Sequence, residues 1–195
     1  MGEGLPSRHR HRGVDRPAPG GTRSAIGYKP VSSLNRLTVA TDGSGESRGG
    51  PGGWGWAAKD GRYQWGGDPH TTHQGMELTA VLKLLRVFPP DQPLLIQADS
   101  IYVIKTFTEW LPVWRKNSMR RSGGKEVAHR ELIETIDGLL NGRDICWEKV
   151  KSHSGHPLND MADSLARLGR TAAKRLDQTY ISNPASLTNV LGMGD

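Results

Sequence analysis

The sequence predicts an α/β fold, a five-stranded mixed sheet flanked by helices. Apolar, β-branched runs at residues 37–41 and 94–98 indicate buried strands. Two aromatic-rich runs, 54–58 and 62–65, flank an Asp-Gly dipeptide, which is a strong hairpin signal. Strand-like runs and amphipathic helical segments follow one another in the order β-β-β-α-β-α-α-β-α, which is typical of one sheet with helices on its faces.

The first strand ends at Thr41-Asp42-Gly43-Ser44. We expect the glycines that follow, up to Gly53, to stop any regular continuation. With the hairpin behind it, this strand forms an antiparallel meander. An aspartate before a glycine is also ordinary turn chemistry, so the tetrad alone leaves a purely structural role open.

A helix comes next. Thr71 and Thr72 can cap it, and it ends near Val87 because two prolines follow. Glu77 interrupts its apolar face within the first two turns. A lone glutamate there can simply favour the helix dipole, so this residue has two interpretations.

The 94–98 strand ends in a second acid, Asp99, and a helix is predicted from Ser100 with Ile101, Ile104 and Phe107 at helical spacing. An acid between a strand and a helix N-terminus matches the arrangement that places ligands at the carboxyl ends of strands.

The remaining elements are a helix over 125–140, a strand over 144–151 and a helix from Asn159 to about Lys174 that carries Asp163. The first of these helices turns five apolar residues inward: Val127, Leu132, Ile133, Ile136 and Leu140.

Length and charge divide the chain. Its 195 residues suit one well-cored domain with tails. We expect a disordered basic arm at 1–36, rich in Arg, Pro and Gly, a catalytic domain at 37–175 and a loosely ordered tail at 176–195.

Lys and Arg outnumber Asp and Glu by 26 to 20, which favours a polyanionic partner. On charge alone, the arm either holds nucleic acid or has no role.

The single cysteine, Cys146, excludes a disulfide framework and fits a reducing compartment. No run of 18 apolar residues could span a membrane, and the N-terminus lacks the apolar core of a secretory signal. We therefore expect a soluble, cytoplasmic protein without a membrane partner. No obligate protein partner is evident, and a monomer is expected.

Four acids are expected to converge. Asp42 and Asp99 end neighbouring parallel strands at the same sheet edge, and helices that bear Glu77 and Asp163 can cover that edge. Clustered carboxylates repel one another unless cations neutralise them, and hard oxygen ligands favour Mg²⁺, with Mn²⁺ as a substitute. Two such ions about 4 Å apart can drive an in-line phosphoryl displacement.

His153 lies on a glycine-containing loop before Asp163, where it can titrate near neutrality and move protons. The pairs His70/His73 and His153/His156 also have zinc-like spacing, but without a second cysteine we disfavour zinc.

A basic, tryptophan-containing segment joins the second and third helices. Two interpretations stay open for it: a nucleic-acid surface that pairs with phosphates and stacks on bases, or a charged loop whose tryptophans anchor it to the core. Its members are Trp110, Trp114, Arg115, Lys116, Arg120, Arg121 and Lys125.

Four ordered motifs closely resemble type 1 ribonuclease H over roughly residues 37–174. They are Thr41-Asp42-Gly43-Ser44, Met76-Glu77-Leu78, the segment 98–103, and the segment 150–156 followed by Asp163-Ser164-Leu165-Ala166. The resemblance implies a ribonuclease H-like fold and metal-dependent endonucleolytic cleavage of the RNA strand of an RNA–DNA hybrid. The products would carry 5′-phosphate and 3′-hydroxyl ends.

The resemblance also implies roles. Asp42, Glu77, Asp99 and Asp163 would bind two Mg²⁺ ions, and His153 would assist product release. The tryptophan-containing segment would grip the DNA strand, and Thr72 would contact a DNA phosphate. Glu77 and the backbone of Ser44 and Gly45 would recognise RNA 2′-hydroxyls, and Gln74 belongs to the same nucleic-acid surface.

Some positions depart from the family pattern. Arg48-Gly49 replaces a frequent Asn-Pro, His73-Gln74-Gly75 replaces Asn-Asn-Arg, and Ile101 replaces a usual Gln. These positions concern substrate grip, whereas the four carboxylates are intact. The alternatives are an integrase- or transposase-like enzyme on the same fold, which would act on DNA ends, and a hybrid-binding module with little or no catalysis.

Overall fold

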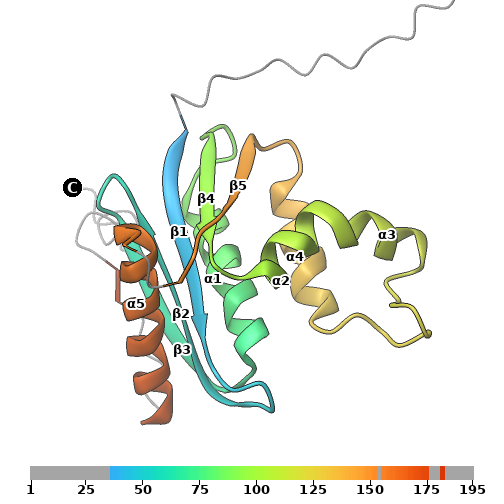
Figure 1. Cartoon of the computed structure of the whole chain (residues 1–195), viewed down its shortest axis with the longest axis horizontal. Helices are drawn as coiled ribbons and strands as arrows, with labels where there is room; N and C mark the ends of the chain where they lie inside the picture. Colours follow the sequence, from blue (N-terminus) through green and yellow to red (C-terminus); the bar gives the residue numbers. More distant parts are fainter. Residues whose placement is uncertain (1–35, 153–154, 176–180, 183–195) are drawn as a thin grey trace, which may run out of the picture. The chain divides into compact units, whose positions relative to one another are not determined.

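The computed structural model describes residues 36–152, 155–175 and 181–182 (Figure 1). They form one mixed sheet whose strand order is β5-β4-β1-β2-β3-β6. The strands are β1 (Leu37–Ser44), β2 (Gly50–Ala58), β3 (Tyr63–Thr71), β4 (Leu94–Ala98), β5 (Ile145–Lys149) and β6 (Ile181–Ser182). The predicted five-stranded sheet is confirmed, and β6 adds two residues against β3. Residues 1–35 of the predicted arm and most of the predicted tail lie outside the described residues. Arg36, the last residue of the predicted arm, forms an ion pair with Asp144.

The pairing of β1 to β4 is the one that the sequence predicts. β1, β2 and β3 form an antiparallel meander, while β4 lies parallel to β1 on its other side. Val39 pairs with Ile96, and Thr41 pairs with Ala98. β5 continues the sheet in parallel beside β4. The two strands that end in acids are therefore neighbours at the centre of the sheet.

The strand β1 continues through Gly43 and Ser44, and β2 begins earlier than we expect, at Gly50. The prediction that the glycines stop regular structure is therefore wrong except over residues 45–49. The helix α5 (Pro157–Lys174) explains the early start of β2. A Cβ on Gly53 would lie 2.1 Å from the carbonyl oxygen of Ala166, and one on Gly67 would lie 2.2 Å from the carbonyl oxygen of Gly169. Glycine in these strands lets the α5 backbone lie directly on the sheet.

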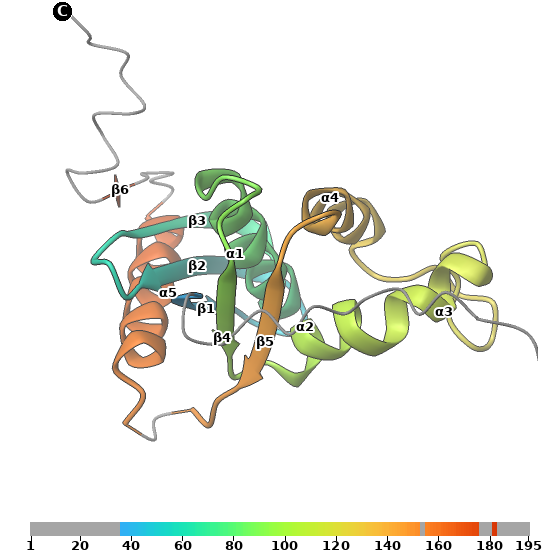
Figure 2. The same cartoon turned by 90° about the horizontal axis from the view of Figure 1, so that it is seen from above.

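The opposite face of the sheet holds the main core (Figure 2). Alternation along β2 turns Trp54 and Trp56 toward the helix α1 (His73–Val87), which supplies an almost wholly buried face. Trp56 meets Phe88 edge-on, with ring centroids 5.5 Å apart. The helix α4 (Arg130–Leu140) packs on α1 and adds Ile133 and Ile136.

The predicted boundaries of α1 are confirmed. The hydroxyl oxygen of Thr72 accepts a hydrogen bond from the backbone N–H of Gly75 at 3.1 Å, which caps the helix as the sequence predicts. At the other end, Phe88 takes an extended conformation before the two prolines. This cap fixes where Glu77 lies, one turn into the helix.

The helical segment after β4 contains an unexpected wide turn. It runs as α2 (Ile101–Lys105), a π-helical turn η2 (Thr106–Trp110) and α3 (Leu111–Lys116). Ser100 caps it, since its Oγ accepts a hydrogen bond from the N–H of Val103 at 3.4 Å. Ile101 keeps its helical spacing, but it is 56% exposed rather than part of the core.

The helix α4 starts five residues later than predicted, at Arg130. Residues 125–127 are instead an extended return from the tip of the basic segment, and a turn at 128–129 follows. Glu126 bridges to Arg120, and Val127 donates its N–H to Met119 O at 3.1 Å. Val127 is buried as expected, through this different geometry. His129, with a left-handed φ of 58°, ends the turn.

The last predicted elements are placed nearly as expected. β5 is shorter than the predicted 144–151 strand, and α5 begins two residues earlier, with Pro157 in its first turn. Cys146 is exposed on β5, the edge strand. Across the described residues, none of the helices combines the length and apolarity that a membrane crossing requires.

Candidate active site

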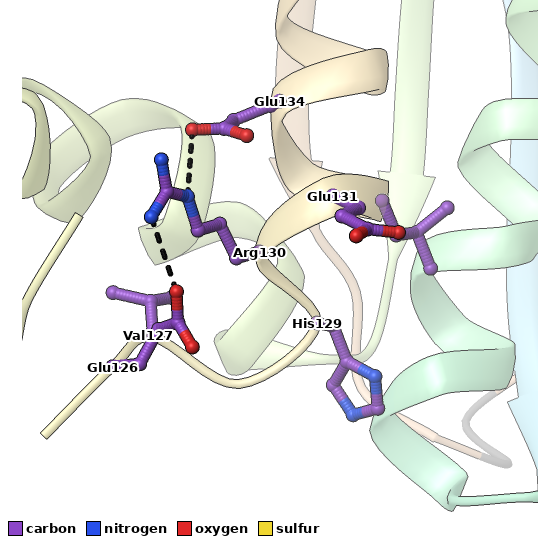
Figure 3. Close-up of a pocket in the computed structure, with 7 residues that line it drawn as sticks. Glu126, Val127, His129, Arg130, Glu131 and Glu134 are labelled. Carbon is purple, nitrogen blue, oxygen red and sulfur yellow. Dashed lines mark hydrogen bonds and ion pairs between the residues drawn. The ribbon is translucent and has the colours of Figure 1, made fainter.

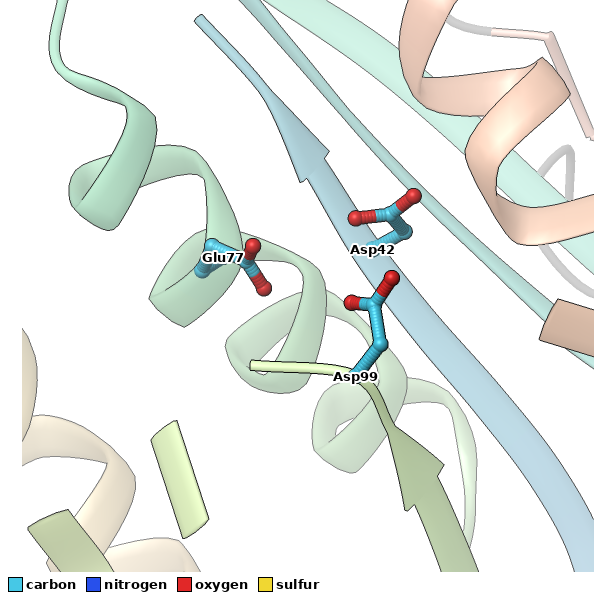
Figure 4. Close-up of side chains that lie close together, drawn as sticks. All are labelled: Asp42, Glu77 and Asp99. Atoms are coloured by element: carbon cyan, nitrogen blue, oxygen red, sulfur yellow. The ribbon is translucent and has the colours of Figure 1, made fainter. Parts of the chain in front are cut away.

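Three of the four predicted acids lie together at the carboxyl edge of the sheet (Figure 4). Asp42, Glu77 and Asp99 each offer a carboxylate oxygen, and these oxygens all lie within 4.8 Å of one another. Asp42 and Asp99 follow the paired residues Thr41 and Ala98, so the parallel register delivers both acids to one edge. Three carboxylates at this spacing form a potential cation site.

Gly43 allows α1 to deliver Glu77 to the same place. A Cβ at Gly43 would lie 2.3 Å from the backbone nitrogen of Glu77, which no side chain tolerates. The glycine after Asp42 is therefore required by the close approach of β1 and α1. Its backbone N–H also donates to Asp42 Oδ1 at 2.7 Å.

Burial disfavours the ionised form of these acids when no cation is bound. Asp42 is 6% exposed; burial first, and then the charge of Asp99, raise its pKa to about 8. Glu77 is 3% exposed, and its pKa is raised well above the ordinary value by burial and by Asp42. Cations placed among the carboxylates would reverse this penalty.

Glu77 shows the need for a cation most directly. Its Oε1 lies 3.2 Å from His73 Nε2, but its Oε2 is buried without any hydrogen-bond partner among the described residues. A buried carboxylate oxygen without a partner is unfavourable unless an ion or water completes it. The site thus fits a hard divalent cation in both donor type and unmet bonding.

Asp163 lies at the rim of the same cavity, which measures about 370 Å³ and is open to solvent. It is close enough to Asp42 to contribute to the raised pKa of that residue. Arg167, one turn further along α5, grips it through two bonds, Nε to Oδ1 at 3.0 Å and Nη2 to Oδ2 at 2.9 Å. The fourth acid therefore lies near the cluster, and it forms an ion pair with Arg167 of the same helix.

Ser152 is a site residue that sequence reasoning missed. Its Oγ donates to Asp99 Oδ2 at 2.6 Å and fixes one face of that carboxylate. The only sequence signal is its position beside His153, at the end of the strand next to the one that carries Asp99. His153 itself lies outside the described residues.

Thr72 and Gln74 flank His73 at the start of α1, and His73 lines the acidic cavity with Ser44 and Gly45. The hydroxyl of Thr72 is hydrogen-bonded to Nε2 of His129 at 3.0 Å. Half-burial lowers the pKa of His129, which keeps its ring neutral near pH 7. His129 was not anticipated, because 57 residues separate it from Thr72.

Some cations of the predicted basic segment are bonded within the protein, and others are exposed and available to a substrate. Arg115 forms an ion pair with Asp137 of α4, and Arg120 donates to Gly124 O at 2.8 Å. Lys116 is exposed. Two tryptophans stack obliquely, Trp110 on Trp114 at 5.7 Å. They line a cavity together with Arg121, Gln74 and Tyr102, a residue that the sequence did not single out.

A further hollow over the start of α4 is unsuited to a polyanion (Figure 3). Its lining includes Glu126, Glu131 and Glu134, and its one arginine, Arg130, bonds Glu126 at 3.1 Å and Glu134 at 3.0 Å. The acids outnumber the cation, which is already paired. Among the described residues, Asp42, Glu77 and Asp99 alone bring three carboxylate oxygens close enough to hold a cation, so the cavity at the sheet edge is the candidate active site.

A mixed sheet whose central parallel strands deliver carboxylates into an open, acid-lined cavity defines a metal-dependent hydrolase of the ribonuclease H-like fold. Comparison with known proteins agrees. The family model "RNase H" matches residues 34–171. The chain belongs to the ribonuclease H family, type 1.

The relatives are similar over most of their length. The chain is 42% identical to ribonuclease H of Tropheryma whipplei over 134 residues, which cover 68% of this chain and 83% of that protein. It is 40% identical to ribonuclease H of Hahella chejuensis over 139 residues, covering 70% and 94%. Among solved structures, LC9-RNase H1, a type 1 RNase H with the type 2 active-site motif, matches with a TM-score of 0.61 at 25% identity, covering 80% of this chain and 82% of that one.

Proposed function

We propose that the protein is an endonuclease that hydrolyses the RNA strand of RNA–DNA hybrids and leaves 5′-phosphate and 3′-hydroxyl ends. The observation that carries this proposal is the cluster of Asp42, Glu77 and Asp99 within 4.8 Å, in a member of the ribonuclease H family. The net charge of +6 favours the polyanionic substrate.

Two Mg²⁺ ions are the proposed cofactors, with Mn²⁺ as a substitute, because the donors are all carboxylate oxygens. Asp42, Glu77 and Asp99 would hold one ion, and Asp42 with Asp163 would hold the other. When bound, the ions supply an activated water and stabilise the leaving 3′-oxygen.

The surrounding side chains have separate tasks in this proposal. Arg167 pairs with Asp163, and its exposed guanidinium would be available to an RNA phosphate if that acid held a cation. Ser152 holds the Asp99 carboxylate in its orientation. His153 moves a proton to or from the leaving oxygen.

Substrate selection follows from the groups around the cavity. Ser44, Gly45 and Glu77 line the acidic cavity, and the backbone of Ser44 and Gly45 and the Glu77 carboxylate are proposed to contact RNA 2′-hydroxyls. Thr72, positioned by its bond to His129, is proposed to contact a DNA phosphate. The DNA strand would lie along Gln74, Trp110, Trp114 and Arg121, which line one cavity. Arg115, Lys116 and Arg120 of the same segment are proposed as further contacts. We further propose a monomer in a reducing, cytoplasmic setting, consistent with the single cysteine.

The test is cleavage of one labelled sequence paired as RNA–DNA, RNA–RNA and DNA–DNA, with Mg²⁺ or with EDTA. We expect internal cuts in the RNA of the hybrid alone, abolished by EDTA and reduced at least about a hundredfold by Asp99→Asn. Asp91→Asn, which changes an exposed acid in the loop before β4, is the matched control and should cut normally.

Other outcomes would support the alternatives. Cutting or joining of DNA ends would favour an integrase- or transposase-like enzyme. Tight hybrid binding without cleavage in either Mg²⁺ or Mn²⁺ would favour a binding module, and the carboxylates would then have no catalytic role.

A further inference from the structure

The glycine-rich turn between β1 and β2 carries one acid, Glu46, whose backbone and side chain bond to two different helices. Its carbonyl oxygen accepts a hydrogen bond from the backbone N–H of His73 at 3.1 Å, at the first residue of α1. Its carboxylate Oε1 lies 2.7 Å from Nη2 of Arg170 on α5. The turn is therefore attached to both helices that carry proposed metal ligands.

Arg170 is placed for this contact by the helical repeat. Asp163, Arg167 and Arg170 follow one another at spacings of four and three residues, so they share one face of α5. The Arg170 side chain is 27% exposed, and its Nε is buried without a partner among the described residues, so Glu46 is its principal charge partner there. A half-buried guanidinium bonded to an acid holds its geometry better than a freely solvated one.

The turn lies tightly against α1. A Cβ on Gly45 would be 3.0 Å from the His73 nitrogen and 3.1 Å from its Cα. Ser44 and Gly45, directly before Glu46, line the acidic cavity, while Glu46 itself is not among the lining residues and its side chain is 59% exposed. Displacement of Glu46 would therefore move the cavity wall without removing any cavity group.

We propose that Glu46 and Arg170 are positioning residues that fix the Ser44-Gly45 backbone against the passing RNA strand. This proposal rests on the proposed function for the identity of the substrate. The pair sets substrate grip rather than the chemical step, because neither side chain reaches the carboxylate cluster. Its loss weakens hybrid binding and raises KM while kcat is retained.

The test is a double-mutant cycle on the full chain with Glu46→Gln, Arg170→Gln and both together. The affinity for a labelled RNA–DNA hybrid is measured in EDTA, where no cleavage occurs, and KM and kcat are measured separately in Mg²⁺. Each single variant should weaken binding and raise KM about three- to fivefold, and the double variant should be no worse than either. The reversed pair, Glu46→Arg with Arg170→Glu, should recover most of the loss.

The matched control is Asp60→Asn, which breaks another exposed acid–arginine pair, 2.7 Å from Arg62, in the β2–β3 turn. It should leave affinity and KM unchanged. The salt dependence is a second readout, since the ratio between variant and wild type should shrink as KCl screens the pair.

Independent, multiplicative losses in the double variant would overturn the proposal, as would a lowered unfolding temperature with unchanged hybrid affinity. The binding measurement, made in EDTA, does not depend on catalysis. If the wild-type protein binds the hybrid without cutting it, the proposed function is wrong, but the role of the Glu46–Arg170 pair in binding is still tested. If only the role of the pair is wrong, the wild-type protein still cuts the hybrid.

Discussion

At the scale of single residues, Asp42 is the position where function opposes stability. A buried carboxyl with a pKa near 8 destabilises the metal-free fold, because it must either lose solvation or take up a proton. We expect Asp42→Asn to abolish cleavage and yet stabilise the metal-free protein by about 2 kcal/mol, or roughly 4–8 °C in Tm. Thermal unfolding in EDTA, followed by circular dichroism, measures the change.

The pH dependence of that gain gives a second prediction. Between the ordinary pKa of 3.8 and about 8, the folded protein binds a proton at Asp42 that the unfolded chain releases. The free energy of unfolding therefore falls as pH rises through this window, and the variant lacks this contribution. The stabilisation by Asp42→Asn should be small near pH 4.5 and greatest above pH 8. A gain that is constant across pH would show that burial of charge is not its cause.

Ser152 tests whether a neutral hydroxyl tunes the site. Ser152→Ala removes the 2.6 Å bond to Asp99 and should lower kcat/KM about two- to fivefold with the fold intact, because the carboxylate loses one fixed orientation. Ser164→Ala is the control, since Ser164 also donates its hydroxyl, to Asp160 O on the exposed side of α5. Equal activity of the two variants would mean that Asp99 is oriented by the cations alone.

At the scale of elements, the contact between α5 and the sheet depends on the absence of side chains. Gly53→Ala would place a Cβ 2.1 Å from both Ala166 O and Arg170 N, and backbone atoms cannot yield cheaply. We expect a loss of about 3 kcal/mol or more in the free energy of unfolding, measured with urea, and a loss of activity as Asp163 moves with α5.

The same substitution elsewhere should do the reverse. Gly138 lies within α4, and a Cβ added there would meet no atom within 4 Å outside its own helical turn, so Gly138→Ala should stabilise the protein by up to about 1 kcal/mol. If both variants behaved alike, the close packing of α5 would not be the reason for glycine in β2.

Much of the element order could be predicted because the signals are local. The cap at Thr72, the prolines after α1 and the acid after each central strand lie within a few residues of what they determine. The early start of β2 could not be predicted, because its glycines are explained by α5, more than a hundred residues later. The late start of α4 has a local cause instead: Arg120 and Glu126, six residues apart, form an antiparallel bridge that the helical spacing of the apolar residues did not reveal.

In the candidate site, too, features set by local signals could be predicted and features set by long-range contacts could not. The convergence of Asp42 and Asp99 follows from the parallel register that the strand order predicts. The contacts of Ser152 with Asp99 and of His129 with Thr72 join residues far apart in sequence, so no local pattern indicates them. Arg115 was predicted as a nucleic-acid contact from its charge, but its partner Asp137 was visible only in the fold.

At the scale of the whole molecule, the basic arm before the sheet remains a prediction from composition. A chain shortened to begin at Ser33 lacks Arg8, Arg10, Arg12, Arg16, Arg23 and Lys29 but keeps Arg36, which pairs with Asp144. We expect this shortened chain to fold and to cut, with weaker hybrid binding and a shallower dependence of log Kd on log salt. Fluorescence anisotropy over a KCl series measures the slope. An unchanged slope would mean that the arm does not contact the substrate.

The order in which the chain supplies its acids has a consequence for biosynthesis. Asp42 lies on β1, whereas Asp163 lies on α5, the last long helix among the described residues. The backbone of α5 packs on glycines of β2 and β3, which are synthesised much earlier. A nascent chain still attached to the ribosome, with α5 inside the exit tunnel, holds an incomplete acid set. We therefore expect cleavage of an RNA–DNA hybrid only after α5 has left the ribosome and packed on the sheet.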